Sequence, residues 1–217
     1  MNYVGTLIDD ADLDRFLRFV APLADDAFGA APDDERHRRV AAAIEGVGLD
    51  PAKEPGAALT RALGLTGAAL ERAVHMVTFY WPSSFVWQRR RGDRLELSGI
   101  HFAVHAETLR AWTGSRSLVT GGGGEERVVM FHGQTFRRFS WLTAAERAAL
   151  REDGRPSPDA LPASALALAP SEWSPSARER YAAQCLAEAA KIAAFARAGA
   201  PGLAYVAYVD NADWSFE

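Results

Sequence analysis

The apolar residues of the first third of the chain recur mainly at helical spacing, after a short strand-like segment at the start. Acids or prolines precede several of these helical stretches, and glycines follow some of them, as expected at helix ends. The predicted elements are a strand over residues 3–8, a helix capped by Asp9 or Asp10, a helix over residues 33–45, and helical pieces over residues 56–63 and 66–80.

From residue 84 the pattern changes to the alternation that is typical of strands. Residues 85–89 and 94–97 flank an Arg-Gly-Asp turn signal and predict a hairpin. The next stretch fits both periods, since Phe102 belongs equally to an alternating set and to a helical one. We expect a strand over residues 100–105, a short helix over 106–113, and a strand pair over 117–120 and 127–132 joined by four glycines.

The last third returns to helix and ends in an apolar strand. Thr143 and Glu146 form a capping-box pattern, which predicts a helix from Ala144. After a Pro-rich connection, Ser174 or Ser176 opens the longest helix, which has an apolar stripe of Cys185, Ala189, Ile192 and Ala196 and ends at Gly199. Residues 203–209 are apolar on both alternating faces, so they predict an internal strand, with the strand over residues 3–8 as a candidate neighbour.

These elements predict an α+β fold with a mixed or mainly antiparallel sheet, N-terminal helices, and a long C-terminal helix followed by an internal strand. With 217 residues, 48% of them hydrophobic, the chain is long enough for a stable core. We expect one domain over residues 1–217, helix-rich over 1–82, β-rich over 83–141, and helical with a final strand over 142–217.

Composition favours a cytoplasmic protein without membrane contact. No apolar run approaches the roughly 18 residues that a membrane span needs. The first residues carry acids where a signal peptide carries basic groups. The single cysteine, Cys185, excludes an intrachain disulfide and lies in an Ala-rich helical pattern typical of a core.

Charge is distributed unevenly and marks the middle of the chain as a candidate binding surface. The net charge is −4, yet residues 85–141 hold nine arginines against five acids. Arginine combined with aromatic residues is typical of recognition surfaces, although an acidic chain is a poor candidate for nucleic-acid binding. The binding candidates are Trp87, Arg89, Arg90, Arg91, Arg94, His101, His105, Trp112 and His132.

The histidines and glycines give no firm sign of a metal or phosphate site. His101 and His105 are four residues apart, and on the predicted strand they would lie about 13 Å from each other, too far to share a metal ion. Acids follow the four glycines, where a phosphate-binding loop would have lysine and a hydroxyl residue. The sequence therefore predicts no metal and no cofactor.

Residues 1–17 and 182–210 together resemble the two ends of the YfbM-like family of uncharacterised bacterial proteins. That family likewise opens with a short strand and an acid-capped helix, and closes with a long helix that runs into an apolar strand. The resemblance implies an α+β fold in a bacterial cytosolic protein, and it carries over no catalytic residues.

Two functions fit these features best, and a metalloprotein is a third, weaker hypothesis. The first is a non-enzymatic binding protein that neutralises or regulates a protein partner, such as an immunity-type protein. The alternative is an enzyme or ligand-binding protein for a small anionic ligand, with an aromatic and arginine pocket and a histidine as acid or base.

Overall fold

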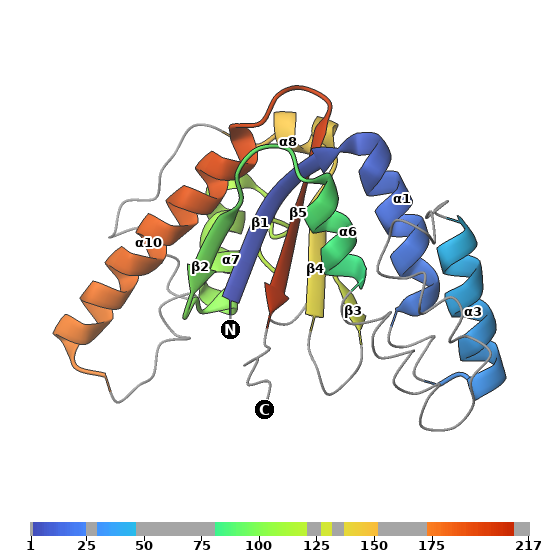
Figure 1. The fold of residues 1–217 in the computed structure, drawn as a ribbon. Coiled ribbons are helices and arrows are strands. Elements are labelled where there is room, and N and C mark those ends of the chain that lie inside the picture. Colours follow the sequence, from blue (N-terminus) through green and yellow to red (C-terminus); the bar gives the residue numbers. More distant parts are fainter. Residues whose placement is uncertain are drawn as a thin grey trace.

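The computed structural model describes residues 2–24, 30–46, 81–120, 127–131, 137–151 and 173–210. In these residues one sheet lies between helices (Figure 1). The strands are β1 (Asn2–Asp9), β2 (Leu95–Ser98), β3 (Val129–Phe131), β4 (Arg137–Leu142) and β5 (Leu203–Asp210). The helices are α1 (Asp10–Val20), the short η1 (Ala21–Leu23), α3 (Asp33–Gly46), α6 (Trp81–Arg89), α7 (Phe102–Thr113), α8 (Ala144–Ala148) and α10 (Pro175–Arg197).

The last strand lies at the centre of the sheet. The five described strands have the order β2-β1-β5-β4-β3, and every neighbouring pair is antiparallel. β5 pairs with β1 along its whole length, from Asn2 opposite Asp210 to Asp9 opposite Leu203. The α+β class and the internal strand beside the first strand are therefore both confirmed.

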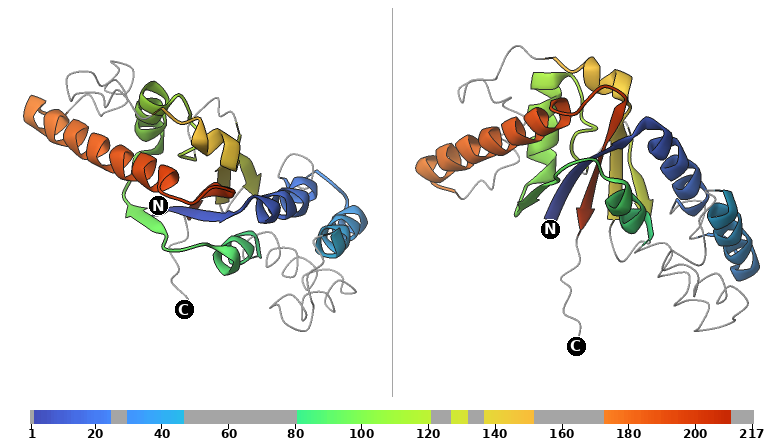
Figure 2. Two further views of the ribbon diagram at one scale, coloured as in Figure 1. Left: turned by 90° about the horizontal axis from the view of Figure 1, so that it is seen from above. Right: turned by 45° about the horizontal axis from the view of Figure 1, so that its top comes forward.

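Both faces of the sheet are covered by helices. The side chains that its central strands direct to each face are therefore apolar. On one face Val4, Ile8 and Val206 pack with side chains of α1, α3 and α6. On the other face Tyr3, Leu7 and their neighbours pack with α7 and α10 (Figure 2). The sheet is thus the middle layer of three.

The predicted hairpin over residues 85–97 is wrong in its first half. Residues 81–89 form helix α6, with Phe85 and Val86 buried against the sheet. Pro82 lies in the first turn of this helix, where a proline costs no hydrogen bond. The predicted strand over residues 94–97 exists as β2, but its partner is β1.

The predicted strand over residues 100–105 is also wrong. Helix α7 begins at Phe102, and its residues Val104, Ala106 and Leu109 are buried against α10 and the sheet. Gly114 ends the helix with φ of 82°, a left-handed conformation that glycine adopts without strain. The helical spacing therefore prevails over the alternating pattern.

Residues 117–120 form turns, so the predicted pairing of this segment with residues 127–132 is wrong. β3 pairs with β4, a strand that the sequence pattern did not predict. Leu118 is buried on the face of the sheet that α7 and α10 cover. Its carbonyl accepts hydrogen bonds from the hydroxyls of Tyr3 at 2.7 Å and Tyr205 at 3.0 Å. The predicted helical pieces over 56–63 and 66–80, the four glycines and the Pro-rich connection lie outside the described residues.

The remaining helix predictions are confirmed. Residues 10–20 and 33–46 are helical, and Thr143 and Glu146 form the capping box at the start of α8. The hydroxyl of Ser174 caps α10 and Pro175 occupies its first turn. The predicted apolar stripe of α10, Cys185, Ala189, Ile192 and Ala196, is buried.

Candidate functional site

The side chains of Trp87, Arg90 and Arg94 form a cluster at the C-terminal end of α6, which we call the Trp87 surface. The guanidinium carbon of Arg90 lies 3.7 Å from the centre of the indole, and that of Arg94 lies 4.1 Å from it. Both distances are typical of cation–π contacts. Trp87 nevertheless remains 39% exposed.

Helical geometry explains the contact between Trp87 and Arg90. Trp87 and Arg90 are three residues apart at the end of a helix, so their side chains lie on one face. The guanidinium of Arg90 also donates a hydrogen bond of 2.8 Å to the carbonyl of Trp87, one of the carbonyls that the helix end leaves without an intrahelical donor. The chain then turns, and Arg94 reaches the indole from the residues before β2.

The neighbouring arginines are largely neutralised by acids of the same chain. Arg91 bonds Asp9 through Nε at 2.9 Å, and this bond raises the pKa of Arg91. Arg89 lies 3.6 Å from Asp12, and Arg94 lies 2.7 Å from Glu96. Within the described ranges Arg90 has no acidic partner, so an uncompensated positive charge lies beside the exposed indole.

The other predicted binding residues lie elsewhere. Trp112 is buried in the core between the sheet and α10, and its ring faces Arg197. His101 is exposed at the start of α7, whereas His105 is fully buried one turn later. His132 lies outside the described residues. The structure therefore brings together the arginines and Trp87, but not Trp112 or the histidines.

His105 forms a buried contact with α10 that no sequence pattern predicts. Its Nδ1 lies 2.9 Å from the carbonyl oxygen of His101, and its Nε2 lies 2.9 Å from Oε2 of Glu188. The amide of Gln184 donates to the other carboxylate oxygen of Glu188 at 3.0 Å. Burial lowers the pKa of His105, against the opposing effect of both contacts.

The predicted strand spacing of His101 and His105, which argued against a shared metal ion, is wrong. The two histidines are at helical, not strand, spacing, but both ring nitrogens of His105 face oxygen atoms. Both ring nitrogens of His105 are therefore already engaged in contacts with oxygen atoms of the protein. Among the residues that the structure describes, no three His, Cys, Asp or Glu side chains are grouped as a metal site.

Cys185 also lies in the seam between α7 and α10. It is buried, and burial raises the pKa of its thiol to about 11. A thiol with such a pKa is protonated near neutral pH and is a poor nucleophile. The structure therefore supports the interpretation of Cys185 as a core residue.

Comparison with known proteins gives no assignment. No family model, no curated protein and no solved structure matches this chain. In the described parts of the chain, no helix combines the length and the apolar character needed to cross a membrane. The YfbM-like resemblance of the two chain ends stays a prediction.

Proposed function

We propose that this chain is a non-enzymatic binding protein of the bacterial cytoplasm, which recognises an acidic protein partner in the manner of an immunity or regulatory protein. The observation that carries the proposal is the Trp87 surface, where a partly exposed indole contacts two guanidinium groups.

The composition of this surface is that of a binding hot spot. Tryptophan and arginine are enriched among the residues that contribute most to protein–protein affinity. Trp87 is also the only large hydrophobic side chain that is exposed among the residues whose burial is described. An indole in this position loses unfavourable contact with water when a partner covers it.

The cluster is also preorganised. The indole contacts both guanidinium groups, and the hydrogen bond to the Trp87 carbonyl fixes Arg90 further. Side chains that are already ordered lose less conformational entropy on binding. Binding of a partner to the Trp87 surface therefore costs less conformational entropy.

The charge of the surface favours an acidic partner. Arg90 has no acidic neighbour in the described ranges, and Arg94 is paired only with Glu96, whose side chain is 52% exposed. A carboxylate of the partner can bind Arg90 without displacing an internal ion pair. Arginine suits this role because its planar group bonds a carboxylate through two donors while its face stays on the ring.

Site-specific photocrosslinking in bacterial cells tests this proposal. A photoreactive phenylalanine analogue at position 87 should capture one defined protein with an acidic surface, which mass spectrometry identifies. The control carries the same analogue at Lys191, which is exposed on α10, a helix of the opposite layer. Equal capture from both positions, or no capture from position 87, would contradict the proposal.

A further inference from the structure

The sequence that follows β5 combines acids with aromatic side chains. Residues 211–217 read Asn-Ala-Asp-Trp-Ser-Phe-Glu and contain no lysine or arginine. They lie outside the described residues. Their carboxylates and aromatic rings are the groups that the Trp87 surface suits, because arginine binds carboxylates and an exposed indole packs against apolar rings. We call residues 211–217 the acidic segment.

Strand β5 ends close to the strand that lies beside the Trp87 surface. Its last residue, Asp210, is opposite Asn2 of β1. Further along β1, β2 begins opposite Gly5, and the amide of Arg91 donates to the carbonyl of Leu7 at 2.7 Å. The Trp87 surface therefore lies three to five residues along β1 from the point where the acidic segment begins.

The acidic segment is long enough to cover this distance. Three to five residues of a strand span about 10–17 Å, and the two strand spacings from β5 to β2 add about 10 Å sideways. The combined separation is about 14–20 Å. Seven extended residues span up to about 23–25 Å. The segment can therefore reach the Trp87 surface of its own chain without any change in the sheet.

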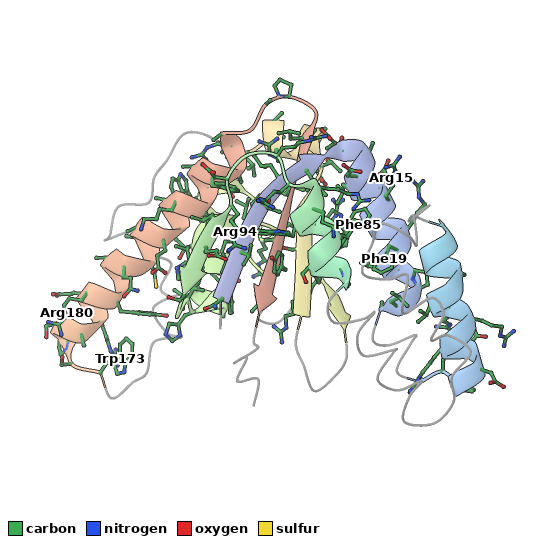
Figure 3. All side chains as sticks on the ribbon, in the orientation of Figure 1. Arg15, Phe19, Phe85, Arg94, Trp173 and Arg180 are labelled. Atoms are coloured by element: carbon green, nitrogen blue, oxygen red, sulfur yellow. The ribbon has the colours of Figure 1, made fainter. Side chains whose placement is uncertain are left out.

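An exposed strip of side chains on β1 and β2 connects the two points. Asn2, Ser98 and Glu96 are all exposed, and each is paired across β1 and β2 on the face of Val4, which packs with α1 and α6. The strip leads to Arg94, which Figure 3 shows beside these strands. Glu96 is the acid of this strip, and Arg94 neutralises it at 2.7 Å. The strip thus leaves room for a segment and offers it little repulsion.

We propose that the acidic segment occupies the Trp87 surface of its own chain, so that an acidic partner binds only by displacing it. A carboxylate of the segment accepts from Arg90, which has no acidic partner in the described ranges, and an aromatic ring covers the indole. A tethered segment has an effective concentration of about millimolar, so individually weak contacts suffice. The regulation rests on the proposed function, whereas the contact within the chain does not.

Photocrosslinking of the purified full chain tests this contact without any partner. A photoreactive phenylalanine analogue at position 214 should crosslink to residues 87–94 of the same chain, as mapped by mass spectrometry. W87A/R90A should reduce this crosslink about tenfold or more, while R15A, at an exposed arginine of α1, should leave it unchanged. Thermal unfolding establishes that each variant is folded. The proposal is overturned if the crosslink lies elsewhere, joins two chains, or persists in W87A/R90A.

The affinity of the acidic partner captured at position 87 tests the regulation. D213N/E217Q keeps the shape of the segment but removes its charge, and it should bind that partner about tenfold more tightly, as for a surface free in about one wild-type molecule in ten. D14N removes an exposed acid of α1 and should bind as the wild type does. Equal affinity of D213N/E217Q and the wild type would overturn the regulation. Capture of a partner without the crosslink within the chain overturns this inference alone, and the crosslink without a captured partner overturns the proposed function alone.

Discussion

Replacement of Arg147 with alanine should destabilise the protein far more than loss of an exposed arginine. Arg147 belongs to α8 and is only 6% exposed. Its Nε donates to the carbonyl of Ala196 at 2.6 Å, and its Nη1 donates to the carbonyl of Leu203 at 2.6 Å. These bonds join α8 to the end of α10 and the start of β5.

The size of the effect follows from what the variant leaves behind. Alanine at this position leaves two carbonyl oxygens without their donor, and it opens a cavity in the space of the guanidinium. A buried polar group without a partner costs about 1–3 kcal/mol, so two of them cost about 2–6 kcal/mol. This is a large share of the roughly 5–15 kcal/mol by which a domain is stable.

Urea unfolding at neutral pH, followed by circular dichroism, measures this loss. The matched control is R110A, because the side chain of Arg110 is 52% exposed and its ion pair with Glu107 lies at the surface. The control should change the free energy of unfolding by no more than about 1 kcal/mol. R147K should be intermediate, since one ammonium group cannot reproduce the fork of donors. If R147A lies within about 1 kcal/mol of the wild type with an unchanged slope, the argument is refuted.

Three further outcomes are expected. G5A should lower the free energy of unfolding by about 1–3 kcal/mol, because the new Cβ would lie 2.9 Å from the hydroxyl oxygen of Tyr205. The G5A/Y205F double variant lacks that hydroxyl, so thermal unfolding should show part of the lost stability restored. If the double variant is no more stable than G5A, the clash with Tyr205 is not the cause. A chain truncated after Gly202 loses the central strand β5 and should show no cooperative thermal transition, so an unchanged transition would make β5 peripheral. Burial lowers the pKa of His105 below 6.5, so the unfolded chain binds a proton more readily than the folded chain does. The free energy of unfolding should therefore fall as the pH falls below about 6.5. If the free energy of unfolding of H105Q depends on pH as that of the wild type does, His105 is not the group responsible.

The parts of the fold that the sequence predicts correctly are those with one unambiguous period. Residues 203–209 are apolar throughout, and a strand covered on both faces buries residues 204–209. The helix over 175–197 carries a cap, a first-turn proline and one continuous apolar stripe. Local signals of this kind reflect the same physics in isolation and in the fold.

The wrong assignments arise where two periods fit the same few residues. Phe85 and Val86 fit either a strand or a helix. Pro82 does not distinguish the two, because a proline can lie in the first turn of a helix or follow the end of one. Over 100–105 the alternation depends on Ile100, which is buried just before the helix begins. Tertiary packing, not propensity, decides such segments.

The site was predictable only in part, for a related reason. Trp87, Arg90 and Arg94 are close in the sequence, so their grouping follows from composition, although the helix that places Arg90 on the indole does not. The contact between His105 and Glu188 spans 83 residues, and the bonds of Arg147 end on backbone carbonyls. No local pattern of side chains encodes either of them.

The affinity of the captured partner for purified variants tests the central proposal most directly. The W87A/R90A double variant should keep the wild-type thermal transition, since both side chains lie at the surface, and should bind at least about 100-fold more weakly than the wild type. Wild-type affinity should also fall as salt rises, because a charged surface steers an acidic partner. R15A should bind as the wild type does. If W87A/R90A is folded and binds with wild-type affinity, the Trp87 surface is not the binding site and the proposal is contradicted.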